Sequence, residues 1–326
     1  MENNIRGGNN ILESKYTKED LKIMQGWSLE RKIMVTQTRI MEWYMHYEGK
    51  VYVSFSGGKD STVLLDLARR IYPDIPAVFV DTGLEYPSIR FFVKSKENVT
   101  WLRPEMNFKQ VIEKYGYPVI SKEVSQKIYD YRRKPDGWTK DRFDENSDYV
   151  KRYGKAYCFS KWIWLRDSDI PVSHQCCNIM KKKPTKKFEK ETGLKPIVAT
   201  MAEESRNRRT AWLNNGCNAF DSKRPTSQPM SFWTEQDVLR YLKQFNIPYA
   251  DDYGDIVEEN GKLKTTGLDR TGCMFCMFGV HLEKEPNRFQ RMKENYPKQY
   301  DFCIRPVEEN GLGEGKVMDY IGVKYD

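Results

Sequence analysis

The chain has 326 residues, of which 39% are hydrophobic and 13% aromatic, enough for one large domain or for a domain with a smaller appendage. Because no apolar run approaches membrane-spanning length and the polar N-terminus shows no secretory signal, we expect a cytoplasmic protein that does not bind membranes. The 54 Lys and Arg against 46 Asp and Glu give a net charge of +8, which suits a polyanionic ligand such as a nucleotide or a nucleic acid.

The first predicted elements surround one polar loop. Residues 17–47 carry apolar side chains at a helical period, and residues 51–55 form a short β-branched and aromatic run that predicts a buried strand. Residues 61–70 return to helical spacing. The loop between them therefore lies at the carboxyl end of a strand and opens a helix, where free backbone N–H groups and the helix dipole favour an anion.

That loop, S-G-G-K-D-S, has the composition of a phosphate-binding site. Its glycines let the backbone approach a ligand, and its lysine adds a positive charge. The spacing differs from the Walker pattern, because the two glycines are adjacent and an aspartate follows the lysine. The alternative is a tight strand–helix turn in which the glycines serve geometry alone. The candidate ligand-binding residues are Ser56, Gly57, Gly58, Lys59, Asp60 and Ser61.

Strands and helices alternate along much of the remaining chain. Strands are predicted at 75–83, 99–104 and 195–200, and helices at 85–92, 108–115 and 234–245. This alternation predicts an α/β fold with a parallel sheet and helices on both faces. Ligands of such sheets bind beyond the carboxyl ends of the strands, where the loop 56–61 and the turn 81–83 would lie.

We expect three regions and one insertion. They are an N-terminal helical segment (1–47), a nucleotide-binding domain (48–225) with an insertion at about 130–165, and a C-terminal cysteine-bearing region (226–326) that is rich in turns after its first helix. The insertion mixes charged and aromatic side chains, and either packs its rings on the core as a lid or stacks bases over a basic groove. A run of five lysines is either a solvated helix face or an anion track. These lysines are Lys181, Lys182, Lys183, Lys186 and Lys187.

Four of the seven cysteines form two pairs. Cys176 and Cys177 are adjacent, and Cys273 and Cys276 form a C-x-x-C motif. In a cytosolic chain we do not expect a disulfide framework, whereas four thiolates can hold zinc or an iron–sulfur cluster. Two adjacent cysteines reach one small ion with difficulty, and a cluster offers them separate irons. The alternative is that the adjacent pair only packs in the interior and the C-x-x-C alone is chemical.

The loop 56–61 resembles the pyrophosphate-binding loop of the PP-loop ATP pyrophosphatases. The segments HQCCNIMKKKP (174–184), WTEQDVLRYLKQFNIPY (233–249) and RTGCMFC (270–276) resemble the phosphoadenosine-phosphosulfate (PAPS) reductase family. The likeness is to its cluster-bearing branch, which includes adenylylsulfate reductases and the ATP pyrophosphatases of DNA phosphorothioation. This resemblance implies ATP and Mg²⁺ as ligands. It also implies a 4Fe–4S cluster held by Cys176, Cys177, Cys273 and Cys276.

The same resemblance assigns further nucleotide contacts to Asp81, Thr82, Gly83, Glu204, Ser205 and Arg209. The chain departs from the family pattern in two places. Met201 stands where the family has an arginine, and a methionine cannot grip an anionic group bidentately. The reductases attack sulfate with a cysteine in a C-terminal E-C-G-x-H segment, whereas the last cysteine here is Cys303, in a different context.

We therefore expect an enzyme that cleaves ATP to AMP and pyrophosphate and so activates a substrate for sulfur transfer. Lys59, Asp60 and Ser61 would be its catalytic residues, DNA or RNA a candidate substrate, and a sulfur-donor protein such as a cysteine desulfurase a candidate partner. One alternative is a sulfonucleotide reductase, which would need Cys303 or a partner's cysteine as nucleophile. The other is a non-catalytic nucleotide-sensing subunit.

Overall fold

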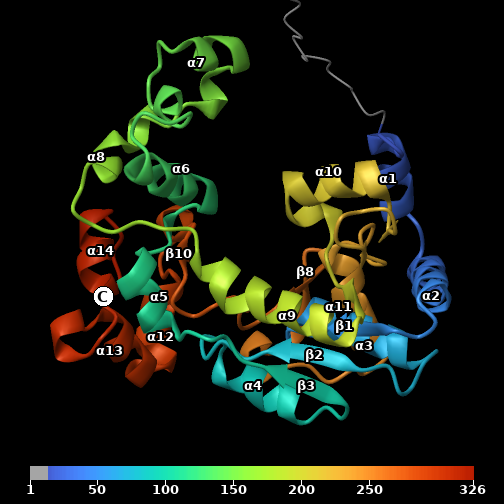
Figure 1. Cartoon of the computed structure of the whole chain (residues 1–326). Coiled ribbons are helices and arrows are strands. Elements are labelled where there is room, and N and C mark those ends of the chain that lie inside the picture. Colours follow the sequence, from blue (N-terminus) through green and yellow to red (C-terminus); the bar gives the residue numbers. More distant parts are fainter. Residues whose placement is uncertain (1–13) are drawn as a thin grey trace, which may run out of the picture. The chain divides into compact units, whose positions relative to one another are not determined.

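The computed structural model describes residues 14–326. These residues form two compact units, each built from separate stretches of the chain (Figure 1). Unit 1 holds the described part of 1–79 together with Ser88–Trp101 and Glu189–Arg270, and unit 2 holds Val80–Pro87, Leu102–Phe188 and Thr271–Asp326. The expected segment 1–47 lies partly outside the described residues, and the region boundaries expected near residues 47 and 225 stay predictions.

A six-stranded sheet has the strand order β3-β2-β1-β5-β7-β6. Its strands are β1 (Val51–Ser54), β2 (Ala77–Val80), β3 (Val99–Leu102), β5 (Lys195–Val198), β6 (Asn218–Ala219) and β7 (Thr226–Ser227). The central strand β1 pairs in parallel with β2 and β5, β5 pairs in parallel with β7, and only the β6–β7 pair is recorded as antiparallel. Parallel neighbours end at the same edge of a sheet, so the loops that follow β1 and β2 leave from one edge.

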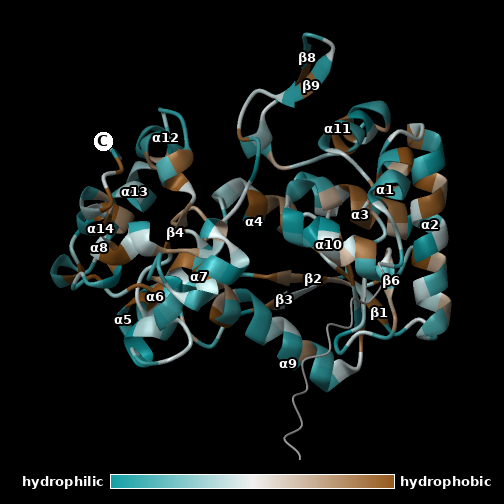
Figure 2. Cartoon of the chain, turned by 90° about the horizontal axis from the view of Figure 1, so that it is seen from above, coloured by the Kyte–Doolittle hydropathy of each residue, from teal (hydrophilic) through white to brown (hydrophobic). Residues whose placement is uncertain are grey.

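Helices cover both faces of this sheet. The helices α3 (Lys59–Arg69) and α4 (Pro87–Lys94) lie on one face, and the unit 1 part of α9 (Lys183–Thr192), from Glu189 onward, lies on the other (Figure 2). Residues 51–53 of β1 are fully buried, as a strand covered on both faces must be. The mostly parallel sheet with two helical layers confirms the α/β fold predicted from the strand–helix alternation.

The predicted helical stretch 17–47 consists of two helices, α1 (Lys18–Gln25) and α2 (Leu29–His46). Each begins after a residue whose hydroxyl accepts a backbone N–H of the first turn, Thr17 for α1 and Ser28 for α2. Such caps satisfy N–H groups that have no partner inside the helix. A second cap inside the periodic stretch therefore explains why it divides.

The remaining helices are α5 (Phe108–Tyr115), α6 (Lys122–Arg133), α7 (Asp148–Tyr153), α8 (Ile163–Arg166), α10 (Arg206–Asn215), α11 (Glu235–Gln244), α12 (Arg288–Asn295), α13 (Pro297–Ile304) and α14 (Glu314–Tyr320). Two small sheets complete the fold, β4 (Val119–Ile120) with β10 (Met277–Phe278) and the hairpin β8 (Ile256–Glu259) with β9 (Lys262–Thr265). Over residues 14–326, no helix is both long enough and apolar enough to cross a bilayer.

The C-terminal end differs from its prediction. Residues expected to be rich in turns form the three helices α12, α13 and α14. Helix α12 begins at Asn287, whose side chain accepts the backbone N–H of Gln290 while the Gln290 side chain accepts that of Asn287. Helix α13 begins with Pro297 at its first position. Both are helix-start signals that outweigh the poor apolar periodicity of this stretch.

A buried acid and a buried thiol pair with each other in unit 2. The Sγ of Cys303 donates a hydrogen bond to Oε2 of Glu314 at 2.8 Å, and both side chains have no exposed surface. Because burial disfavours the charged form, it raises the pKa of Glu314 to about 8. Burial also raises the pKa of the Cys303 thiol well above its ordinary value. At neutral pH the pair therefore favours its uncharged form.

This pair should make unit 2 less stable as pH rises. The folded-state pKa of Glu314 lies above its ordinary 4.5, so the folded chain retains a proton that the unfolded chain releases. The stabilisation from this proton should be complete below about pH 4.5 and be lost as pH rises to about 8, a loss on the order of 5 kcal/mol. Urea unfolding at several pH values should show this slope in the wild type and a much smaller one in Glu314→Gln. Equal slopes in both proteins would contradict the prediction.

Candidate functional site

The loop 56–61 lies between β1 and α3, at the sheet edge that the sequence predicted. Gly57 has a φ of +75°, and a Cβ at this position would lie 2.7 Å from Val93 and 2.8 Å from Ile89 of α4, so no larger residue fits. Gly58 precedes α3 and provides no side-chain cap. The residue before α3 therefore leaves the first-turn N–H groups of this helix without a side-chain cap, and uncapped N–H groups at a helix start suit an anion.

Lys59 is the first residue of α3 and is buried. Its Nζ lies 2.9 Å from Oε1 of Glu235 and donates a hydrogen bond to the backbone carbonyl of Asp269. The ring of Tyr253 lies 5.3 Å from the same ammonium group, and the Tyr253 hydroxyl accepts the backbone N–H of Lys59 at 3.2 Å. A segment about 200 residues later in the sequence thus orients this lysine.

The other polar side chains of the loop have distinct environments. The Ser61 hydroxyl accepts the backbone N–H of Ser56 at 3.2 Å and lies 3.0 Å from the Ser56 hydroxyl. Asp60 is largely buried, and its Oδ1 has no hydrogen-bond partner among residues 14–326. Burial raises the pKa of Asp60, and the positive charges of Lys59 and Arg270 partly oppose this shift.

The nucleotide-binding residues predicted after β5 have different environments. Glu204 forms ion pairs with Arg208 and, at 3.6 Å, with Arg270. The Ser205 hydroxyl accepts the backbone N–H of Arg208 at 3.2 Å and so begins α10. Arg209 is exposed, whereas the charge of its neighbour Arg208 acts on the buried aspartate of the loop 56–61.

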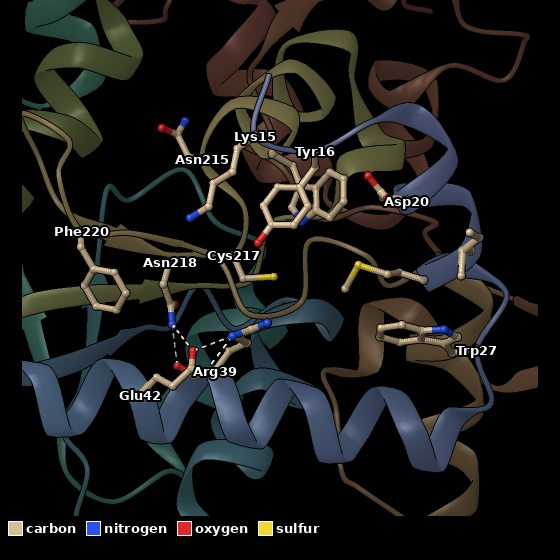
Figure 3. Close-up of a pocket in the computed structure, with 13 residues that line it drawn as sticks. Lys15, Tyr16, Asp20, Trp27, Arg39, Glu42, Asn215, Cys217, Asn218 and Phe220 are labelled. Atoms are coloured by element: carbon tan, nitrogen blue, oxygen red, sulfur yellow. Dashed lines mark hydrogen bonds and ion pairs between the residues drawn. The ribbon is translucent and has the colours of Figure 1, made fainter. Parts of the chain in front are cut away.

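Unit 1 also contains a cavity of about 320 Å³ that does not include the loop 56–61. Tyr16 and Cys217 lie on one side of it, and Arg39 and Glu42 of α2 lie on the other (Figure 3). Arg39 donates to both carboxylate oxygens of Glu42, at 2.7 and 2.9 Å. The guanidinium and the carboxylate of this wall therefore pair with each other.

The turn after β2 belongs to unit 2 and is closed by its own side chains. Asp81 accepts the backbone N–H of Gly83 at 3.3 Å. The hydroxyl of Thr82 donates to Glu85 at 2.7 Å, and the Thr82 backbone N–H donates to the same carboxylate at 3.0 Å. The three predicted residues therefore form a compact acidic turn with a fixed backbone.

Backbone pairing in unit 2 collects the cysteine-bearing segments around one short strand. Strand β4 pairs in parallel with β10, which directly follows the C-x-x-C motif. Tyr117, just before β4, forms a parallel bridge with Val172, which leads to the adjacent cysteine pair. A Cβ on Gly116 would lie 2.4 Å from the neighbouring backbone, so only glycine permits this close approach. Two cysteine pairs far apart in sequence are thereby brought together.

All four predicted ligand cysteines line one small cavity. Its lining residues are Leu84, Phe108, Pro118, Cys176, Cys177, Met180, Lys181, Cys273, Phe275 and Cys276. All seven cysteines of the chain are free, and the Sγ atoms of Cys176 and Cys177 lie 3.8 Å apart. Within the part of the chain that the structure describes, no three His, Cys, Asp or Glu side chains converge closely enough to hold one metal ion.

The adjacent cysteines differ in acidity. The Cys176 thiol donates a hydrogen bond to Cys177, which lowers the pKa of Cys177 to about 6 and raises that of Cys176. Nearby lysines, Lys122 among them, lower the pKa of Cys177 further. Burial raises the pKa of Cys276 to about 12. Charge in the cavity is therefore concentrated on one thiolate, while burial favours neutral thiols at the others.

Lys181 does not belong to an exposed run of lysines. It lies in a π-helical turn, Asn178–Lys182, and lines the cysteine cavity. Burial lowers the pKa of Lys181, but Cys273 and Glu85 outweigh it and raise this pKa to about 12. The remaining four lysines of the predicted run are exposed. The extra residue of a π-turn rotates the side chains that follow it, which a helical count from the sequence does not foresee.

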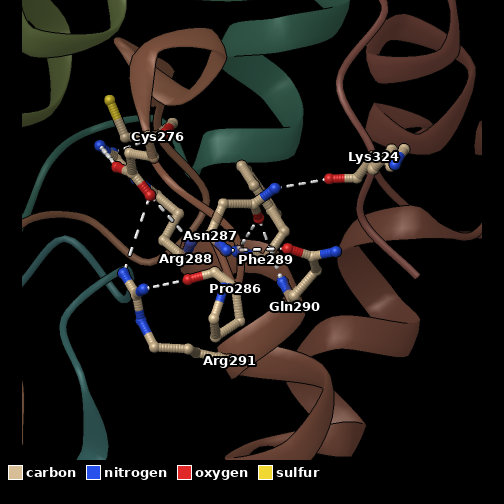
Figure 4. A network of polar contacts seen from close by, with 9 residues as sticks. Cys276, Pro286, Asn287, Arg288, Phe289, Gln290, Arg291 and Lys324 are labelled. Atoms are coloured by element: carbon tan, nitrogen blue, oxygen red, sulfur yellow. Dashed lines mark hydrogen bonds and ion pairs between the residues drawn. The ribbon is translucent and has the colours of Figure 1, made fainter.

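An arginine fixes the backbone of the C-x-x-C motif (Figure 4). The Nη1 of Arg288 donates to the carbonyl of Cys276 at 2.9 Å, and its Nε donates to Glu283 at 2.6 Å. Glu283 also accepts the backbone N–H of Arg288 at 2.8 Å. Arg291 lies 3.7 Å from the same carboxylate. Because Arg288 joins α12 to the residue before β10, it couples the helix to the cysteine cavity.

Sequence reasoning missed the groups that surround the predicted residues. Glu235 and Tyr253 hold Lys59, and Arg288 holds the carbonyl of Cys276. Glu235 occupies the first turn of α11, where an acidic side chain is ordinary, so its sequence context does not distinguish it. These partners are separated widely in sequence, and only the folded chain brings them together.

A family model described as the phosphoadenosine phosphosulfate reductase domain matches residues 50–277. An uncharacterized protein of Methanocaldococcus jannaschii is 24% identical over 297 residues, which cover 89% of this chain and 55% of that protein. The chain thus spans about half the length of this relative. The adenosine 5′-phosphosulfate reductase of Staphylococcus haemolyticus is 27% identical over 214 residues, which cover 64% of this chain and 68% of that enzyme.

Two solved structures resemble the fold at low TM-scores. A phosphoadenylyl-sulfate reductase of Candida auris, in a phosphate complex, has a TM-score of 0.38 and 12% identity, covering 76% of this chain and 97% of that chain. The FMN adenylyltransferase of Candida glabrata in complex with ATP has a TM-score of 0.40 and 13% identity, covering 74% of this chain and 67% of that chain.

Replacing Arg288 by alanine should loosen the C-x-x-C segment. The change removes a bond to the Cys276 carbonyl and leaves Glu283 with fewer partners, so the free energy of unfolding should fall by about 1–3 kcal/mol. Urea unfolding measures this loss. Arg291→Ala is the matched control, because Arg291 lies 3.7 Å from the same Glu283 and its hydrogen bond to the Pro286 carbonyl is exposed, so the change should cost less than about 1 kcal/mol. Equal losses in both variants would rule out a special role for Arg288.

Proposed function

The chain belongs to the phosphoadenosine phosphosulfate reductase domain family, and we propose that within this family it cleaves ATP between the α- and β-phosphates. An acceptor oxygen attacks the α-phosphorus, the bond to the bridging oxygen breaks, and pyrophosphate leaves with the electron pair of that bond. With water as acceptor the products are AMP and pyrophosphate. With a substrate oxygen as acceptor the product is an adenylylated substrate; a sulfur nucleophile then attacks the substrate atom that carries this oxygen, and AMP leaves with the oxygen and the electron pair of the broken bond.

The observation that carries this proposal is the geometry of the loop 56–61. Gly57 brings the backbone against α4, Gly58 leaves the start of α3 without a side-chain cap, and Lys59 supplies a buried ammonium group. Such a loop stabilises the negative charge that develops on departing pyrophosphate. Glu235, 2.9 Å from the Lys59 ammonium, marks the position that a phosphate oxygen would take.

The loop also has a group suited to Mg²⁺. Oδ1 of Asp60 is buried without a hydrogen-bond partner among the residues described, and an unpaired carboxylate oxygen suits a hard cation. Asp60 would hold Mg²⁺ together with phosphate oxygens, since Mg²⁺ in nucleotide sites takes few protein ligands. When bound, Mg²⁺ neutralises charge on the phosphates. Ser61 would orient the loop through its bond to the Ser56 backbone.

Sulfonucleotide reduction is the second candidate, because adenosine 5′-phosphosulfate reductases are among the relatives. Two features of this chain disfavour it. Met201 is 3% exposed and provides no charged group for a sulfate. Cys303 is fully buried against Glu314, and its raised pKa keeps it a thiol rather than the thiolate that attacks sulfur. The ATP pyrophosphatase is therefore the better supported of the two.

We also propose that the four cysteines of unit 2 hold a 4Fe–4S cluster. The cavity lining supplies four thiols and the half-buried ammonium group of Lys181, which suits an anionic thiolate-ligated group. A cluster would take one of these thiolates on each of its four irons. When bound, a cluster supplies one-electron chemistry. The cysteine residues concerned are Cys176, Cys177, Cys273 and Cys276.

The proposed reaction also needs an acceptor and a source of sulfur. A net charge of +8 and the exposed lysines of α9 favour a polyanionic acceptor such as DNA or RNA. A sulfur-donor protein, such as a cysteine desulfurase, would supply the sulfur. A nucleotide-sensing subunit without turnover remains the non-enzymatic alternative, and measured turnover distinguishes it from the enzyme.

The proposal predicts the products and the residue they depend on. Anaerobically purified protein with Mg²⁺ should convert ATP to AMP and pyrophosphate, measured by chromatography of the nucleotides, and should release no sulfite from adenylylsulfate or PAPS with a thiol reductant. Lys59→Ala removes a charge-assisted contact of about 1.5–3 kcal/mol and should weaken ATP binding or turnover about tenfold or more.

The control for this experiment is Lys94→Ala, in the last turn of α4, where an exposed lysine serves no phosphate. Its turnover should match that of the wild type. Sulfite release that Cys303→Ser abolishes would restore the reductase. ATP bound tightly but left intact by a well-folded protein would favour the sensing subunit.

The cluster proposal has its own prediction. Anaerobic protein should be brown and contain about four iron and four sulfide per chain. Serine at Cys176, Cys177, Cys273 or Cys276 should remove the colour, because a serine hydroxyl replaces the thiolate ligand. Serine at Cys158, Cys217 or Cys303, which do not line the cavity, should leave iron content unchanged. Stoichiometric zinc without iron would exclude the cluster.

A further inference from the structure

The insertion in unit 2 exposes one continuous stretch, residues 151–157, at the end of α7 (Figure 1). Its sequence is K-R-Y-G-K-A-Y, and every one of its residues is exposed. Tyr153 is 51% and Tyr157 41% exposed, so both side chains are accessible to a ligand. We call this stretch the exposed aromatic–basic loop.

Cations that take part in no ion pair with the described residues lie beside the two rings. Residues 149–166 contain three lysines and two arginines but no aspartate or glutamate. Among the residues described, Lys151, Arg152 and Lys155 form no ion pair. A solvated helix face normally mixes both signs of charge, and this stretch does not. Although Asp148 stands in the first turn of α7, no ion pair within residues 14–326 holds these three cations, and they remain available to an external anion.

The rings are held by a small core rather than left loose. Phe143, Val150 and Phe159 are buried beneath the loop. The Nε of Arg142 donates to the carbonyl of Tyr157 at 2.9 Å, and its guanidinium lies 5.5 Å from the Tyr157 ring centroid. Rings ordered in advance lose little entropy when a ligand stacks on them.

The ring of Tyr153 packs against the ring of Tyr149. Its ring centroid lies 4.6 Å from that of Tyr149, whose hydroxyl accepts Nη1 of Arg142 at 3.1 Å. The aromatic residues of the insertion thus divide by chemistry, because the phenylalanines pack inside while these tyrosines face water. Neither alternative drawn from the sequence describes this division fully.

We propose that the exposed aromatic–basic loop binds single-stranded nucleic acid, with bases stacked on Tyr153 and Tyr157 and backbone phosphates paired with Lys151, Arg152 and Lys155. Every base has a face that can stack on a ring, and alternating rings and cations match the alternation of bases and phosphates along a strand. A duplex hides its base faces, so the rings would add nothing to its binding. This inference deepens the proposed function, on which it rests, by naming the acceptor class.

The test is binding of fluorescein-labelled single-stranded DNA and RNA, about 15 nucleotides long, to the full chain without ATP, followed by fluorescence anisotropy over a salt series. Tyr153→Ala/Tyr157→Ala should weaken binding roughly tenfold or more at every salt concentration and leave the salt slope unchanged. Tyr153→Phe/Tyr157→Phe should restore binding, because phenylalanine keeps the stacking face. Lys151→Gln/Lys155→Gln should reduce the slope of log K against log salt by about 1.4.

Matched controls are Phe91→Ala and Lys262→Gln, which change an exposed ring of α4 and an exposed cation of β9. Both should bind like the wild type. Unaltered binding in the Tyr153→Ala/Tyr157→Ala variant, equal affinity for a duplex of the same sequence, or preference for phosphatidylserine vesicles over oligonucleotides would each overturn the inference. ATP cleavage by the same variants, measured without oligonucleotide, separates the two claims. Intact cleavage with no strand binding sinks only the inference, and strand binding with no cleavage sinks only the proposed function.

Discussion

The fully buried parallel strand β1 is the constraint from which the loop 56–61 follows. Its residues 51–53 are covered on both faces, and its two parallel neighbours fix its direction within the sheet. The chain must therefore leave at the carboxyl edge and turn at once into α3. The turn passes so close to α4 that only glycine fits at position 57, and Lys59 becomes the first helical residue. Backbone packing thus decides the position of the lysine.

In unit 2 the backbone brings two cysteine pairs that are distant in sequence to one cavity. A strand of only a few residues does so by pairing with β10 and bridging to Val172. So short a pairing contributes little stability by itself, and Arg288 ties the carbonyl of Cys276 to α12. The half-buried ammonium group of Lys181 opposes the charge that ionised thiols would place in this cavity.

The strand and helix beside the loop 56–61 could be predicted from local sequence patterns, whereas contacts between distant segments could not. The run 51–55, the S-G-G-K-D-S string and the apolar period after it are all contained within twenty residues, so the strand, loop and helix could be foreseen. The burial of Lys59 against Glu235 depends on a segment far along the chain. The inward turn of Lys181 depends on a π-turn that no periodicity reveals. The N-x-x-Q pattern at Asn287 indicates the start of α12, but the weak apolar periodicity of the residues that follow favoured turns instead.

The charge balance around Lys59 also limits which ligand suits the loop. A buried ammonium group requires a negative partner, and in this structure Glu235 supplies it while remaining 46% exposed on its side chain. A phosphate oxygen can replace that carboxylate without leaving the ammonium unpaired, because Glu235 returns readily to water. The buried carboxylate of Asp60 has the opposite need, since a phosphate alone would add repulsion beside it. A phosphate that arrives with a divalent cation satisfies both groups together, whereas a bare sulfate or phosphate satisfies only the lysine.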